Sequence, residues 1–185
     1  MSHGSFRIGR KYAQHVYPEP RSVGQPGPGV APAYGVAYGS NAITIPFNAD
    51  VPFTPGATPF PNQGFTSVPA PGGTTFVVAT TGDYEFDFYV AGDHQTSGTT
   101  PLAFAIFIGG VSAGTNYEFV GDQGNNAAQV CVGHGIIHLT AGDNVTLRNR
   151  TNTGGGGESV NVSNPAGVGA DADSSNRMFS LSRVG

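Results

Sequence analysis

Apolar and polar residues alternate along most of the chain after residue 33, and a period of two is typical of strands with one buried face. The clearest segment is 83–91, in which every second residue is large and apolar: Tyr84, Phe86, Phe88 and Val90. Three neighbouring rings on one face present too much apolar area to leave in water. We therefore expect this face to be buried, either between two sheets or between subunits.

The same pattern predicts further short strands, separated by turns rich in glycine, proline, asparagine and aspartate. They cover residues 42–47, 75–79, 102–108, 111–113, 117–120, 128–139, 144–149, 159–163 and 178–184. Gly109-Gly110 predicts a tight hairpin, and 141–143 predicts that 128–139 pairs with 144–149. Roughly eight to ten short strands without competing helical periodicity predict an all-β sandwich or barrel.

The composition agrees with one β domain. The 185 residues include 29 glycines and 14 prolines, and charged residues are only 11%. A chain of this length buries roughly 70% of its unfolded surface and can fold without covalent cross-links. Cys131 is the single cysteine, so no internal disulfide can form.

The first residues differ in character from the rest. We interpret 1–23 as a connector or anchor, 24–33 as a glycine-proline hinge, and 34–185 as the head domain. The connector has a charge of about +3 and the remainder about −7, which is too mild a basic excess to predict nucleic-acid binding. We expect the connector to dock on a neighbouring unit through basic and aromatic side chains: Phe6, Arg7, Arg10, Lys11, Tyr12 and Tyr17.

Three segments carry specific patterns: Phe76 followed by Gly82–Phe88, then Leu139–Leu147, and the final 179–184. Together they resemble the complement globular-head family, which is related to tumour necrosis factor. The nearest likeness is to the C-terminal heads of bacterial collagen-like spore-surface (exosporium) proteins, over residues 34–184. Two departures are Pro69, where the family has an aromatic residue or leucine that Phe65 would replace, and the missing collagen stalk.

The resemblance implies a ten-stranded antiparallel jelly roll of the tumour necrosis factor type, with three copies around a threefold axis. The expected core or trimer-interface residues are Phe76, Tyr84, Phe86, Phe88, Leu139, Val145, Leu147, Phe179 and Leu181. The partners would be other copies of the chain, as homotrimer and stacked trimers, and other surface or fibre-anchor proteins. Neither nucleic-acid binding nor membrane insertion is expected.

Two groups of residues invite a metal interpretation. His134 and His138 share a face of one predicted strand, but Gly133 and Gly135 would bulge it, so we favour surface or interface histidines. Asp171, Asp173 and Asn176 supply oxygen atoms, but the glycine and distal glutamate of a calcium loop are missing, which favours a plain turn.

No catalytic or cofactor-binding residue emerges from the sequence. Cys131 lies between two valines in a predicted strand, which is typical of an inert core thiol. The Gly154–Gly157 loop lacks the lysine and helix of a phosphate-binding loop. We therefore predict a protein that is not an enzyme and that needs no metal or cofactor.

The favoured function is a structural subunit of a surface fibre or spore appendage, with trimeric heads linked by N-terminal connectors. The alternative is a terminal adhesin, lectin or receptor-binding module at the tip of another fibre, on a spore or a phage tail. The N-terminus carries no apolar run typical of a secretory signal, so we expect an extracellular or spore-surface protein without a cleaved signal peptide.

Overall fold

The computed structural model describes residues 32–53, 63–67, 69, 73–94, 100–121, 129–152, 156–163 and 175–184. The predicted connector and hinge lie outside them, apart from Pro32 and Ala33. All described strands belong to one compact unit, Ala31–Gly185. That unit includes Ala33, which is buried and accepts a hydrogen bond from the Arg183 amide at 2.7 Å.

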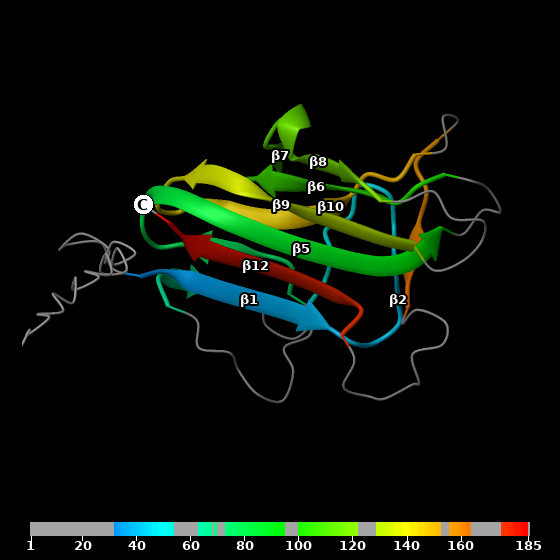
Figure 1. Ribbon diagram of the computed structural model, residues 1–185, viewed down its shortest axis with the longest axis horizontal. Coiled ribbons are helices and arrows are strands. Elements are labelled where there is room, and N and C mark those ends of the chain that lie inside the picture. Colours follow the sequence, from blue (N-terminus) through cyan, green and yellow to red (C-terminus); the bar gives the residue numbers. More distant parts are fainter. Residues whose placement is uncertain are drawn as a thin grey trace, which may run out of the picture. The chain divides into compact units, whose positions relative to one another are not determined.

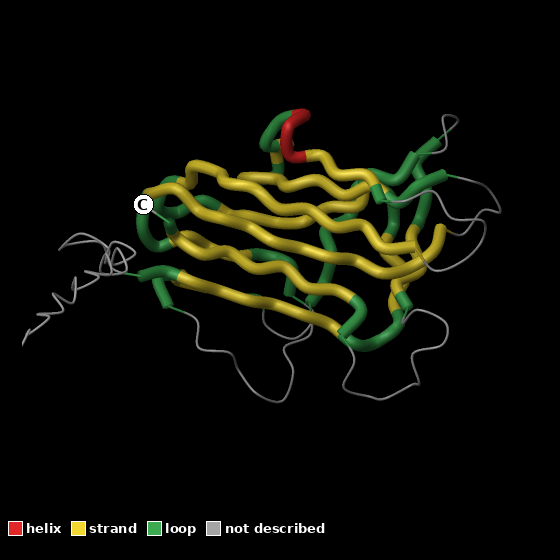
Figure 2. Tube along the Cα trace, viewed as in Figure 1, coloured by secondary structure: helices red, strands yellow, loops and turns green. Residues whose placement is uncertain are grey.

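The described residues form two antiparallel sheets with a single short 3₁₀ turn, η1 (Thr115–Tyr117) (Figures 1 and 2). The first sheet contains β1 (Tyr34–Gly39), β12 (Arg177–Arg183), β5 (Gly82–His94), β11 (Val160–Val162) and β2 (Ile43–Ile45), with β9 (Gln129–Leu139) beside β5. The second contains β3 (Phe65–Ser67), β4 (Phe76–Val78), β10 (Asn144–Asn149), β6 (Ala103–Ile108) and β7 (Val111–Ser112), with β8 (Glu118–Val120) beside β6.

The chain crosses repeatedly from one sheet to the other, as it does in a jelly roll. It passes from β4 to β5, from β5 to β6, from β8 to β9, and from β9 to β10, changing sheets each time. The predicted all-β jelly-roll sandwich is therefore confirmed. The Gly109-Gly110 hairpin is also confirmed, because β6 pairs with β7 and both glycines have the positive φ of a tight hairpin turn, 58° and 81°.

The predicted pairing of 128–139 with 144–149 is wrong. β9 pairs with β5 in the first sheet, whereas β10 pairs with β4 and β6 in the second. The turn between β9 and β10 is held instead by β4, whose Val78 amide donates to the Asp143 carbonyl at 3.0 Å and whose carbonyl accepts from Gly142 at 2.8 Å. The chain changes sheets at this turn. Leu139 belongs to the first sheet and Val145 to the second, and both side chains lie in the core between the sheets.

One hydrophobic core fills the space between the sheets, and the nine predicted core residues all lie in it, each at most 2% exposed. Their rings form edge-to-face contacts, such as Phe76 with Phe179 at a centroid distance of 5.3 Å. Phe65 packs its ring against Phe76 and Tyr84, and Pro69 is buried as well.

Two glycines of β9 make room for the rings of β5. Gly135 lies opposite Phe86 and Gly133 opposite Phe88 in an unbroken register. A Cβ atom on Gly135 would lie 2.9 Å from the Phe86 ring, and one on Gly133 would overlap the Phe88 ring. The prediction of a bulge at these glycines is therefore wrong. Glycine is needed at both positions because the Phe86 and Phe88 rings extend over the opposite residues of β9.

Replacing Phe86 by alanine tests this core. Its ring is 1% exposed and contacts Tyr117 and Phe119. We expect Phe86→Ala to lower the free energy of unfolding by about 3–5 kcal/mol, because the cavity adds to the lost burial. Chemical denaturation measures this, and Val184→Ala, at a half-exposed site, is the control, with an expected change within about 0.5 kcal/mol. Equal effects of the two substitutions would contradict the assigned register of β5.

Candidate interaction surface

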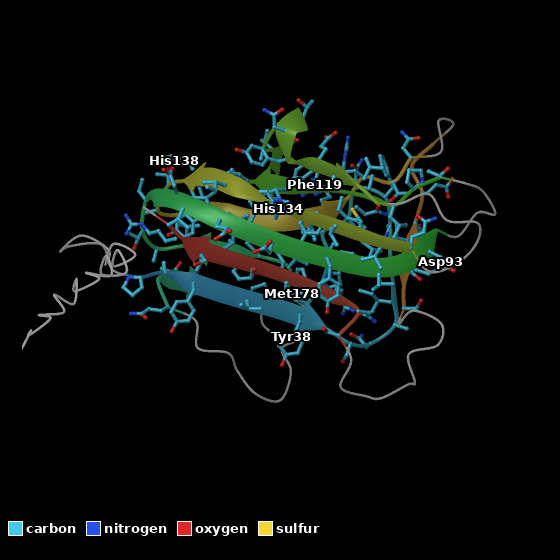
Figure 3. The ribbon with its side chains drawn as sticks, viewed as in Figure 1. Tyr38, Asp93, Phe119, His134, His138 and Met178 are labelled. Atoms are coloured by element: carbon cyan, nitrogen blue, oxygen red, sulfur yellow. The ribbon has the colours of Figure 1, made fainter. Side chains whose placement is uncertain are left out.

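The outer face of the first sheet, over β1, β12, β5 and β9, is the candidate interaction surface, and we call it the open face. Backbone register places its side chains in rows that cross all four strands. One row is entirely apolar or aromatic: Tyr38, Met178, Tyr89 and Val132. Figure 3 shows Tyr38 and Met178 at the β1–β12 end of this face.

Apolar side chains on β9 are strongly exposed on this face. Val132 is 62% exposed and Ile136 is 60% exposed, and Val130 on the same side is 42% exposed. Among the described strands β9 pairs only with β5, so these residues stand at the edge of the sheet. Exposed apolar side chains gathered on one strand in this way are typical of a surface that contacts another protein.

Acidic and imidazole side chains alternate with these apolar groups. On β5, Asp83, Glu85 and Asp87 all point outward, and register sets Asp83 beside His138 and Asp87 beside His134. Figure 3 labels the two histidines on β9. The Asp83 Oδ1 and His138 Nδ1 atoms are 2.7 Å apart, with both side chains more than half exposed. The four strands carry no lysine or arginine on this face, so its charge is negative when the imidazoles are neutral.

The predicted surface location of the two histidines agrees with this arrangement. His134 and His138 share a face, but they are separated along β9 by Ile136. Within the described residues, no group of three or more histidine, cysteine, aspartate or glutamate side chains is placed to hold a metal ion. Asp171 and Asp173 of the predicted turn lie outside those residues.

Asn176, the described end of that turn, belongs to a buried polar cluster that sequence reasoning missed. Its Oδ1 atom accepts a 2.6 Å hydrogen bond from the guanidinium of Arg177, which is 1% exposed. Arg177 also donates to the carbonyls of Pro52 and Asn41, at 2.6 and 2.9 Å, and Gly39 leaves space for its guanidinium. Burial lowers the pKa of Arg177 to about 10, which leaves it charged at neutral pH. This cluster ties β12 to the segments around residues 41 and 52.

Cys131 is fully buried in the core, on the inner side of β9. Its thiol lies 3.5 Å from the Phe119 carbonyl, and burial raises its pKa to about 12. Because the thiolate is the reactive form, the thiol has almost no nucleophilic character near neutral pH. The structure thus places the only thiol away from the open face.

In the described residues, no helix is long and apolar enough to cross a membrane.

Comparison with solved structures finds the same fold in tumour necrosis factor ligands and in a complement head. Eiger TNF from S. frugiperda matches with a TM-score of 0.54 and 13% identity, over 83% of this chain and 94% of that chain. Murine APRIL gives 0.55 and 15%, over 83% and 100%. The globular domain of zebrafish complement 1qA gives 0.52 and 12%, over 80% and 94%.

The predicted likeness to tumour necrosis factor and complement heads is therefore confirmed at the level of fold. At these identities the comparison concerns the fold alone, and the likeness to spore-surface heads stays a prediction. No protein-family model matches the sequence, and no curated protein matches it.

The raised pKa of the buried thiol predicts slow chemistry at Cys131. At about pH 8 the native protein should react with a thiol reagent at least about a hundredfold more slowly than the unfolded chain, because both thiolate formation and access are suppressed. Labelling with and without denaturant, followed by mass spectrometry, measures the two rates. Rapid labelling of the native protein would show that β9 opens locally or that the thiol is not buried.

Proposed function

We propose that this chain is a non-enzymatic structural subunit whose jelly-roll head assembles as a homotrimer through the open face. The observation that carries the proposal is the exposure of Val132 and Ile136, each at least 60%, at the edge of a face that also holds the Tyr38–Met178–Tyr89 row. Removing such side chains from water stabilises an association.

The arrangement of the apolar groups favours a ring. The exposed β9 side chains lie at one end of the open face, and Tyr38 and Met178 lie at the other, three and two strands away respectively. When the two ends of this face contact each other between copies, each copy uses a different end toward each of its neighbours. Such contacts close into a ring when the rotation between copies is suitable, and three copies are the number that the predicted family implies.

We further propose that the trimers are joined into a surface fibre, on a cell or spore, by the connector of residues 1–23. Its charge of about +3 is opposite to that of the remaining chain, about −7, which favours encounter between the connector of one unit and the head of another. Residues 1–29 can span at most about 95–105 Å when extended, enough to reach a neighbouring unit. Tyr12 and Tyr17 would supply the apolar anchors.

The trimer is tested with the full-length chain by analytical ultracentrifugation at micromolar concentration. We expect about three chains per particle. Val132→Asp with Ile136→Asp should give a folded monomer, because charges would replace the exposed apolar groups on β9. The matched control is Val111→Asp, at a 71% exposed valine of β7 in the other sheet, which should remain trimeric. A monomeric parent protein would refute the trimer, and a trimeric double variant would place the contact elsewhere.

The fibre is tested by electron microscopy of the full-length chain and of a variant lacking residues 2–23. The full-length protein should form filaments, and the truncated one should stop at folded trimers. Tyr12→Ala with Tyr17→Ala should weaken filament formation without changing the melting temperature, since the head is a separate compact unit. A full-length chain that stops at the trimer would instead favour a tip module. Filaments without residues 2–23 would place the fibre contacts in the head.

A further inference from the structure

The open face carries an ordered ladder of acids and imidazoles that the self-association proposal does not by itself explain. We define this ladder as Asp83, Glu85 and Asp87 of β5 with His134 and His138 of β9. Register pairs Asp83 with His138 and Asp87 with His134, and Glu85 lies between the two pairs, opposite Ile136. One pair is in hydrogen-bond contact, at 2.7 Å between Asp83 Oδ1 and His138 Nδ1.

The described groups that face the two histidines are acidic or uncharged. On β5 they face only the ladder's carboxylates and Tyr89, with Asp93 near the far end of the strand. β12 contributes no titratable group to this face, and β1 contributes Tyr34 and Tyr38. Next to β9, Tyr117 donates to the Ile136 carbonyl, Glu118 is exposed on β8, and Asp143 accepts from the Thr140 amide.

The charge of the ladder depends on how many of its two imidazoles carry a proton. With neutral imidazoles the ladder carries three negative charges and no positive one. Imidazoles gain a proton between about pH 8 and pH 5, whereas carboxylates are ordinarily still ionised there. Two protons would therefore reduce the ladder's charge from three negative to one, without any change in the apolar groups beside it.

We propose that the self-association of this chain is controlled by pH through the ladder, and that it tightens as the pH falls. The inference rests on the proposed use of the open face. Bringing three such faces together gathers nine carboxylates in a space from which water is partly removed, and like charges in that setting repel each other strongly. Protonated His134 and His138 offset this repulsion. The assembled state then binds protons more tightly than the free chain does, so association takes up protons and is favoured at lower pH.

The test measures the dissociation constant of the full-length chain by sedimentation between about pH 8 and pH 5.5, the range in which histidine titrates. Association should tighten by about tenfold or more over this range. His134→Gln with His138→Gln should abolish the pH dependence, and both side chains are exposed, so the fold should be unaffected, as circular dichroism would check. His94→Gln, which removes a histidine outside the ladder, is the control and should keep the pH dependence. Asp83→Asn with Asp87→Asn should tighten association at about pH 8 by a similar factor.

The possible outcomes separate this inference from the proposed function. A trimer whose dissociation constant is the same at all pH values, or is weaker in acid, overturns the pH control and leaves the self-association intact. A pH dependence that survives the double histidine substitution also overturns it. A chain that stays monomeric at every pH overturns the self-association, and the pH control with it.

Discussion

The strict alternation of β5 is the constraint on which the rest of the structure depends. Tyr84, Phe86 and Phe88 point into the core, while Asp83, Glu85 and Asp87 point outward on the same strand. A slip of one residue against β12 or β9 would bury three carboxylates and expose three rings. The large cost of burying unpaired charges therefore fixes the register of the strand, which in turn fixes its neighbours on both edges.

Those neighbours follow from the shape of the β5 side chains. The rings of Phe86 and Phe88 reach across toward β9, where only glycine fits opposite them, at positions 135 and 133. The middle of β9 consequently has the small residues Cys131, Gly133 and Gly135 on its inner side, and the strand has valines, isoleucine and histidines on its outer side. The strand whose glycines make room for the core rings also carries exposed apolar side chains on its outer side, at the edge of the sheet. One strand, β9, therefore both packs against the rings of the core and carries exposed residues of the candidate interaction surface.

The open face combines two opposing tendencies. Its apolar groups favour contact with another copy, whereas its carboxylates resist it. Which tendency dominates depends on the charge of two imidazoles, whose places beside Asp83 and Asp87 are set by the β5–β9 register. The candidate contact surface and its proposed control by pH have the same structural origin. The β5–β9 pairing that aligns the rings with the glycines also aligns the acids with the histidines.

The sequence by itself determined the all-β class, most strand positions and the buried face of β5, because a period of two reports directly which residues share a face. It also indicated that His134 and His138 lie on one side of their strand. Apart from the β6–β7 hairpin, it could not determine which strands are neighbours, since the other partners are far apart in the chain. The β9–β10 corner, the fit of glycines 133 and 135 against the rings, the Asp83–His138 pair and the buried Arg177 cluster were decided only by the tertiary structure. Each depends on contacts between elements whose distance in space is set by the whole sandwich rather than by local pattern.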